Sequence, residues 1–264
     1  MAYQCVNASN QYFTIAALNI SVPPVTFSVW INTASIIAKS TALFIWRGAI
    51  NTGLFLNYTN PNWELRYYVA GGNQWQTATG LYVSTGAWQH ACVAISSSQA
   101  RLYLDGANFT NNVSHSTANI NAAGDLARDP LVDLSHTSFN GSVAEPAIWT
   151  ASLSDAECLA LSKRVSPLLL TNRLQNLVMY KDMIRDLNRG IGPTLTAVNA
   201  PSVVAHLPMI YPASRLQAMY RPAHFLPPFR LSTATAHANP VARGCAELVG
   251  AAQGTTHPIG EVSN

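Results

Sequence analysis

Trp88-Gln89-His90, Leu102-Tyr103-Leu104-Asp105-Gly106, Phe139-Asn140-Gly141 and Ala151-Ser152-Leu153-Ser154-Asp155-Ala156-Glu157 are the four segments that decide the fold of this chain. The first three predict strands. Asp105-Gly106 predicts a tight hairpin, because a type I′ turn requires positive φ at both central residues. Ser154 and Glu157 have the S-x-x-E spacing of a capping box, in which each side chain binds a backbone N–H of the first helical turn. The sequence therefore predicts a hairpin, a further strand and a capped helix.

Residues 11–150 consist of short apolar runs separated by turn residues, which is typical of an all-β sandwich. The run 63–69 shows the period-two pattern of a strand with one face inward. Its two faces are Trp63, Leu65, Tyr67 and Val69 against Glu64, Arg66 and Tyr68. A short helix is expected near residues 154–165, since Pro167 cannot continue it. Added strands are expected near residues 176–200, as a pair formed by 177–180 and 194–198.

The succession of a W-x-H strand, a Y-x-D-G hairpin and an L-S-D-A-E helix resembles the laminin-G-like, concanavalin A-like jelly-roll family over residues 10–165. The resemblance implies an all-β fold, a two-sheet antiparallel jelly-roll sandwich with one short helix. Family members usually carry an Asp before the Glu of the last strand, whereas Ala144 precedes Glu145 here. No catalytic residues are implied.

The continuation of the chain resembles laminin-G-like proteins encoded by tailed bacteriophages. The residues that carry this second resemblance are Ser166-Pro167, Asn176 to Tyr180, Ile184-Arg185-Asp186, Ala205-His206 and Tyr211-Pro212. In such proteins the domain lies on the outside of the virion, as a capsid decoration or fibre component, or on the tail. The resemblance implies a virion surface protein made in the host cytoplasm, with other virion proteins or copies of itself as partners.

Composition changes after about His206. Nine of the fifteen prolines fall from Pro193 onward, and residues 207–264 contain no lysine and no sustained periodicity. We therefore expect a sandwich over residues 1–206 and an extended Pro-rich C-terminal arm over 207–264. The residues expected to anchor the arm in an assembly are Tyr211, Tyr220, Arg221, Phe225, Phe229 and Arg230.

Charged residues make up only 10% of the chain, with a net charge of +3, against roughly 25% charged residues in typical soluble domains. Such a surface suits permanent contact with other protein. No basic run is interleaved with aromatic residues, so nucleic acid is not an expected partner. The N-terminus lacks a signal-peptide pattern, and no segment reaches the roughly 18 apolar residues of a membrane span. The cysteines are too widely spaced for a C-x-x-C motif and are expected as buried free thiols: Cys5, Cys92, Cys158 and Cys245.

The acidic residues do not predict an enzyme. Glycosidases need two carboxylates about 5 to 9 Å apart, which on one strand means an acidic i, i+2 pair. The five glutamates lack such a strand pair, because Asp155 and Glu157 belong to the helix cap, and no G-x-S-x-G elbow occurs. A glycan-cleaving enzyme is a further hypothesis, and its activity would depend on Glu64 or Glu145.

Metal binding is not expected from the histidines, which have no H-x-H or H-x-x-x-H spacing. His90 is interpreted as a strand residue with satisfied hydrogen bonds. Asp125, Asp129 and Asp133 cluster in a polar loop, either as calcium ligands or as solvated turn residues. Apart from this calcium alternative, no cofactor is expected.

Aromatic residues near the Gly71-Gly72 turn form a candidate ligand-binding patch, because exposed rings stack on sugar faces while polar groups bind hydroxyls. Its members are Trp63, Arg66, Tyr68 and Trp75. The alternative is that Trp63 is a core residue and Trp75 packs on a loop. The sequence thus favours a non-enzymatic virion surface protein that also adheres to host glycans. The alternative function is a soluble carbohydrate-binding lectin.

Overall fold

The computed structural model describes residues 2–46, 52–69, 78–130, 136–184 and 186–212. The chain divides into two units, Met1–Leu216 and Gln217–Asn264, and every described residue belongs to the first. Several residues named by the sequence analysis lie outside the described residues: Trp75, Asp133, Tyr220, Arg221, Phe225, Phe229, Arg230 and Cys245.

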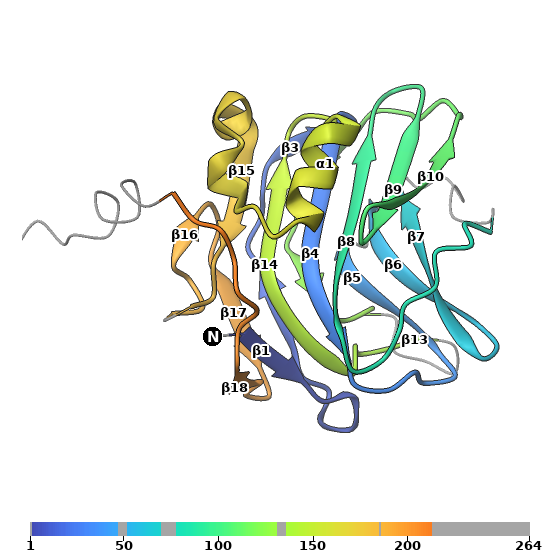
Figure 1. The fold of residues 1–264 in the computed structure, drawn as a ribbon, viewed down its shortest axis with the longest axis vertical. Coiled ribbons are helices and arrows are strands. Elements are labelled where there is room, and N and C mark those ends of the chain that lie inside the picture. Colours follow the sequence, from blue (N-terminus) through green and yellow to red (C-terminus); the bar gives the residue numbers. More distant parts are fainter. Residues whose placement is uncertain (1, 47–51, 70–77, 131–135, 185, 213–264) are drawn as a thin grey trace, which may run out of the picture. The chain divides into compact units, whose positions relative to one another are not determined.

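Two large sheets, sheet A and sheet B, form the first unit (Figure 1). The strands of sheet A are β1 (Ala2–Cys5), β4 (Val25–Thr33), β8 (Trp88–Ile95), β9 (Ala100–Leu104), β10 (Ala107–Asn111), β14 (Gly141–Trp149), β15 (Leu177–Lys181), β16 (Gly190–Ile191) and β18 (Ser202–Val204). Their order is β10-β9-β8-β4-β14-β1-β18, and β15 pairs with both β14 and β16. All of these pairs are antiparallel.

Sheet B faces sheet A across the main core. Its strands are β2 (Tyr12–Ile15), β5 (Ser40–Trp46), β6 (Thr52–Thr59), β7 (Asn62–Tyr68), β12 (Gly124–Leu126), β13 (His136–Thr137) and β17 (Leu195–Val198). The order is β17-β2-β12-β5-β6-β7, with β13 running parallel to β5. A separate two-stranded sheet pairs β3 (Ile20–Val22) with β11 (Ala118–Ile120).

The main core lies between the sheets because alternating residues of each strand point to one face. Phe27 and Val29 of β4 are fully buried there with Phe44 of β5 and Val93 of β8. The rings of Phe27 and Phe44 lie 5.6 Å apart, centroid to centroid. The predicted two-sheet jelly-roll sandwich is confirmed.

One α-helix covers part of the outer face of sheet A. It is α1 (Asp155–Ser162), which lies over β14, β4 and β8 in Figure 1. The 3-10 helices are η1 (Asn7–Ser9), η2 (Pro167–Leu169) and η3 (Thr171–Asn176). Within the described ranges, no helix is both long enough and apolar enough to cross a bilayer.

The local turn and capping predictions are confirmed. β9 and β10 form the hairpin, and Asp105 and Gly106 between them have φ values of 51° and 89°. At the start of α1, the Ser154 hydroxyl accepts the Glu157 N–H, and Glu157 Oε2 accepts the Ser154 N–H at 2.7 Å. Both features depend on neighbouring residues only.

The two strands predicted after the helix exist, but they do not pair with each other. β15 joins β14 in sheet A, whereas β17 joins β2 in sheet B. The prediction of a pair is wrong because the connecting residues carry the chain from one sheet to the other. Nearness in sequence does not decide the pairing here.

Residues 202–212, which we call the strap, pack against sheet A. β18 pairs with β1, and Leu207 is only 3% exposed in a cluster with Trp30 on the outer face of the sheet. Further along, the Ile210 N–H donates to the Arg164 carbonyl at 2.8 Å. The described end of the predicted arm is therefore part of the sandwich, and the boundary expected at residue 206 falls too early.

Candidate functional site

Three of the four predicted ligand-binding residues, Trp63, Arg66 and Tyr68, lie on β7 but not on the same face, and Trp75 lies outside the described residues. Trp63 is fully buried in the main core, where its indole Nε1–H donates to the Lys39 carbonyl at 2.7 Å. Arg66 and Tyr68 lie on the outer face of sheet B, because an odd number of positions separates each from Trp63. The prediction of Trp63 as a sugar-stacking ring is wrong, and its interpretation as a core residue is confirmed.

Arg66 is engaged by Glu64 on the same face of β7. Its Nε donates to Glu64 Oε2 at 2.7 Å, and its Nη2 binds the same oxygen. Glu64 Oε1 accepts the backbone N–H groups of Thr79 and Gly80 at 2.6 and 2.8 Å. Burial pushes the pKa of Glu64 upward, but the Gly80 N–H and Arg66 outweigh burial and hold that pKa below its ordinary value. This fully buried carboxylate is structural.

Tyr68 is half-buried and packs edge-on against Phe55, with ring centroids 4.7 Å apart. Phe55 forms a small apolar cluster with Ala42 and Ile45 on the outer face of sheet B. Of the four predicted ligand-binding residues, only Arg66 and Tyr68 are therefore brought to one described face, and Arg66 is already bound there.

Glu145 lies at a β-bulge of β14, where the register with β4 shifts between Ala144 and Ala147. Its φ of +54° is in the left-handed region, which costs a non-glycine residue roughly 1–2 kcal/mol. The side chain is only 1% exposed. A strained residue of this kind persists where the surrounding structure fixes it.

Side chains from β15 and the strap bind the Glu145 carboxylate. The Tyr180 hydroxyl donates to Oε2 at 2.6 Å, and the Tyr211 hydroxyl donates to Oε1 at 2.5 Å. His206 Nε2 lies 3.0 Å from Oε1. Burial raises the pKa of Glu145, and the bonds from His206 and the two tyrosines offset part of that rise. Because both oxygens are occupied, the carboxylate fastens the strap to sheet A.

Tyr211 therefore has a partner within its own chain. The sequence analysis assigns Tyr211 to an assembly contact, and this assignment stays a prediction beside the observed bond to Glu145. The other predicted anchors lie outside the described residues and stay predictions.

His90 of β8 is fully buried beside Trp30. Its Nε2 lies 2.8 Å from Ser28 Oγ, whereas Nδ1 has no hydrogen-bond partner among the described residues. Burial lowers the pKa of His90 from 6.5 to about 3. The interpretation as a satisfied strand histidine therefore holds for one ring nitrogen only.

Acid is expected to destabilise the protein through His90. The unfolded chain takes up this proton near pH 6.5 and the folded chain only near pH 3. The stability that the neutral ring contributes is therefore fully present above pH 6.5 and is lost as the pH falls toward 3. Urea unfolding of wild type and His90→Gln between about pH 7 and about pH 4 measures this. Equal pH dependence in the two proteins would contradict the assignment.

The aspartates of the polar loop are only partly described. Asp129 is fully buried, and burial raises the pKa of Asp125 to about 6. Among the residues that the structure describes, no three His, Cys, Asp or Glu side chains gather as a metal site. With Asp133 outside this set, the choice between calcium ligands and solvated turn residues is not tested.

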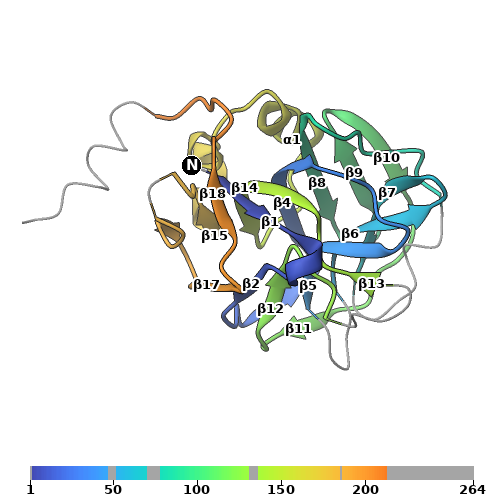
Figure 2. The same ribbon diagram turned by 90° about the horizontal axis from the view of Figure 1, so that it is seen from below.

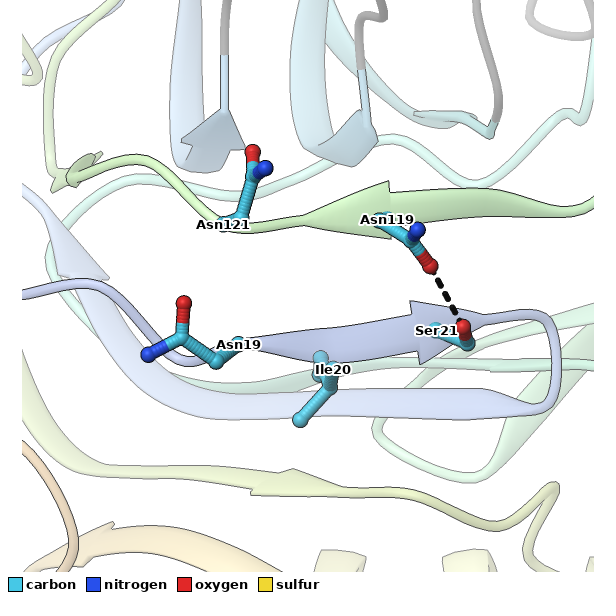
Figure 3. A pocket seen from close by; sticks show the side chains of 5 residues that line it. All are labelled: Asn19, Ile20, Ser21, Asn119 and Asn121. Atoms are coloured by element: carbon cyan, nitrogen blue, oxygen red, sulfur yellow. Dashed lines mark hydrogen bonds between the residues drawn. The ribbon is translucent and has the colours of Figure 1, made fainter.

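A polar pocket lies beside the small sheet of β3 and β11 (Figure 3). Its volume is about 270 Å³, and its lining residues are Asn19, Ile20, Ser21, Asn119 and Asn121. The strand register sets Asn119 opposite Ser21, and the Ser21 hydroxyl donates to Asn119 Oδ1 at 2.5 Å. Asn19 and Asn121 lie together at the other end of the strand pair in Figure 3.

Local backbone structure presents these side chains. Asn119 and Asn121 are exposed, while Ile120 between them is buried, as alternation along a strand requires. Asn19 directly precedes β3 with a φ of 54°, a conformation that asparagine tolerates better than most residues. Amides from two distant segments therefore border one pocket.

The pocket suits a neutral ligand that carries several hydroxyl groups. Each asparagine offers one carbonyl acceptor and two N–H donors, and serine offers a hydroxyl. None of its five described lining residues is charged. The volume of about 270 Å³ is just below the roughly 300–1,000 Å³ of typical ligand pockets. One unit of a longer ligand would fit.

The sequence analysis missed these residues. In the sequence alone, Asn19-Ile20-Ser21 is an N-x-S/T triplet, which is typical of a polar loop. Residues 19–21 and 119–121 share no local motif, because β3 and β11 meet only in the folded sandwich. The alternation of polar and apolar residues at 119–121 is the one local signal.

Comparison with known proteins agrees with this architecture. A family model described as the concanavalin A-like lectin/glucanases superfamily matches residues 7–158. A native heptameric SAP-like pentraxin from Limulus polyphemus is similar in structure, with a TM-score of 0.54, 12% sequence identity, and coverage of 76% of this chain and 92% of the pentraxin chain.

A Bacteroides ovatus protein assigned to carbohydrate binding gives a TM-score of 0.51 at 12% identity, with coverage of 78% of this chain and 63% of that chain. At such identities the two likenesses show the fold alone. The comparison with curated protein sequences finds no match. Because the family match spans more than half of its residues, this chain belongs to the concanavalin A-like lectin/glucanases superfamily.

Proposed function

We propose that this protein is a non-enzymatic glycan-binding protein of a virion surface, which holds one unit of a neutral carbohydrate in the pocket beside β3 and β11. The observation that carries the binding function is the lining of that pocket by three asparagines and a serine. Amide and hydroxyl groups can bind sugar hydroxyls as both donors and acceptors. Membership of the concanavalin A-like lectin/glucanases superfamily supports a carbohydrate as the ligand class.

The surroundings of two glutamates support binding without cleavage. The Glu64 carboxylate accepts hydrogen bonds from Arg66 and from backbone N–H groups. The Glu145 carboxylate accepts hydrogen bonds from Tyr180 and from Tyr211 of the strap. A glycosidase needs two carboxylates that reach opposite sides of the scissile bond. Neither of these buried side chains reaches solvent, and we expect the bound glycan to be recovered intact.

A glycan array probed with the full chain tests the binding function. The Asn119→Ala variant is expected to bind its best glycan about tenfold more weakly, because it loses a hydrogen bond worth roughly 0.5–1.5 kcal/mol and the Ser21 contact that orders the pocket. Titration calorimetry with that oligosaccharide measures the change.

Asn108→Ala is the matched control. Asn108 is an exposed asparagine of β10, the edge strand of sheet A. The Asn108→Ala variant should bind the glycan as tightly as wild type. An array without any specific signal would contradict glycan binding. Equal affinity of Asn119→Ala and wild type would place the binding site elsewhere.

The virion part of the proposal is supported by the sequence. It rests on the resemblance to phage-encoded laminin-G-like proteins, on the 10% content of charged residues, and on the Pro-rich residues 213–264 that follow the described unit. We assign those residues to attachment, either to a particle or to copies of this chain.

Light scattering of the full chain and of a chain ending at Leu216, the end of the first unit, tests attachment between copies. Attachment predicts an oligomer that the shorter chain does not form, or co-sedimentation of only the full chain with particles. A full chain that is monomeric and sediments with no particle would instead favour the alternative, a soluble lectin.

A further inference from the structure

Two cysteines meet beneath helix α1. Cys92 of β8 and Cys158 of α1 are 66 positions apart in the sequence, and their Sγ atoms lie 3.8 Å apart. Both are free and fully buried in the apolar cluster between α1 and the outer face of sheet A. Cys5, also free and buried, lies in the main core between the sheets.

The start of α1 is fixed to the strand beside Cys92. Tyr103 of β9 lies directly opposite Cys92 in the strand register, and its hydroxyl donates to Asp155 Oδ1 at 2.6 Å. Arg101 of the same strand binds Asp155 and donates from Nη2 to the Leu153 carbonyl at 3.0 Å. The strand that neighbours Cys92 thus also positions the helix that carries Cys158.

The hairpin after β9 holds the other side of the helix. A Cβ atom added at Gly106 would lie 2.9 Å from Leu159 Cδ1, so the turn packs against α1 too closely for a side chain at this position. Leu161 packs with Cys158 in the same buried cluster. Contacts of α1 with β9 and with the turn at Gly106 therefore hold the helix that carries Cys158 against sheet A.

We propose that Cys92 and Cys158 form an intramolecular disulfide when the protein meets an oxidant of the small-molecule disulfide class, such as oxidised glutathione. One thiolate attacks the oxidant disulfide and releases one small thiol, and the second thiolate then attacks the mixed disulfide and releases the other. The two cysteines lose two electrons and two protons, which the oxidant carries away as two thiols. The inference does not rest on the proposed glycan binding.

The required movement is small. A disulfide needs an S–S distance of about 2.05 Å, and the two sulfur atoms start from 3.8 Å. Burial raises the pKa of Cys92, and Cys158 raises it further, so thiolate is scarce at neutral pH. The exchange is therefore expected to be slow and to accelerate toward alkaline pH. A reducing cytoplasm would keep the pair as thiols, and an oxidising exterior would close it.

Mass spectrometry of the full chain under non-denaturing conditions tests the proposal. The Cys245→Ser background leaves only the three described cysteines. After incubation with oxidised glutathione at about pH 8.5, near the ordinary thiol pKa, the protein should be lighter by two hydrogens. Peptide mapping should give one cross-linked species that joins Cys92 to Cys158.

Closure should also raise the melting temperature reversibly. The bond constrains the unfolded chain across the 66 positions between the cysteines, so the Tm is expected to rise by about 5–10 °C and to return on reduction. Cys5→Ala is the matched control and should keep the cross-link. Cys92→Ala and Cys158→Ala should abolish it.

The mapping in the Cys245→Ser background leaves Cys5, Cys92 and Cys158 unchanged, so it does not depend on the folding of a variant at these three positions. Three free thiols after prolonged oxidation, with or without mild urea to open α1, would overturn the proposal. Stable glutathione adducts on single cysteines, or a cross-link that includes Cys5, would overturn it as well.

Discussion

Replacing Trp63 with alanine is expected to lower the free energy of unfolding by about 3–5 kcal/mol, the range for a large aromatic removed from a core. The indole is fully buried, its ring centroid lies 6.0 Å from that of Phe139, and its Nε1–H donates to the Lys39 carbonyl at 2.7 Å. The change leaves a cavity and removes the hydrogen bond to the Lys39 carbonyl. Urea denaturation followed by circular dichroism measures the loss.

Trp63→Phe separates the two contributions. Phenylalanine keeps most of the apolar contact but loses the N–H, so we expect a smaller cost, with about 1 kcal/mol due to the hydrogen bond. An alanine variant with wild-type stability that had lost only glycan binding would contradict the core assignment of Trp63.

Replacing Glu145 with alanine is expected to cost about 3 kcal/mol. The change leaves the hydroxyls of Tyr180 and Tyr211 without their carboxylate acceptor in a buried site, and each such group costs roughly 1–3 kcal/mol. It also releases the strap, so amide hydrogen exchange should increase at Ile210, whose N–H bonds to the Arg164 carbonyl. Both readouts can be taken on one protein sample.

Glu145→Gln provides the control. An uncharged amide keeps an acceptor for one tyrosine, and burial already favours the neutral acid because it raises the pKa of Glu145. We expect a loss of about 1 kcal/mol, near that of one hydrogen bond. Equal losses for Gln and Ala, or an Ala variant as stable as wild type, would show that the carboxylate does not hold the strap.

Features that depend on neighbouring residues could be predicted from the sequence. Asp105 and Gly106 adopt the positive φ angles that the hairpin turn requires. Ser154 and Glu157 form the capping box at the start of α1. The sequence also predicted which face of the strand carries Trp63, because alternation along β7 places Trp63 on one face and Arg66 and Tyr68 on the other. Grouping these three residues in one patch contradicted that alternation.

Features that join distant segments could not be predicted in this way. The pocket needs Asn19 beside Asn121, and only the pairing of β3 with β11 brings them together. The strap shows no periodicity, since it is held by single contacts such as Leu207 on Trp30 and Tyr211 on Glu145. A proline-rich segment of this kind is indistinguishable from a free tail by composition.

The position of β1 affects how a new chain reaches this fold. Within this unit β1 is made before both of its partner strands, because Tyr3 pairs with Val143 on one side and Val203 on the other, as the neighbouring strands in Figure 2 show. Contacts of such long sequence separation slow folding, and an open strand edge invites pairing with other chains. The first strand of this unit thus waits longest for its partners, and the sandwich closes only when synthesis of the unit is nearly complete.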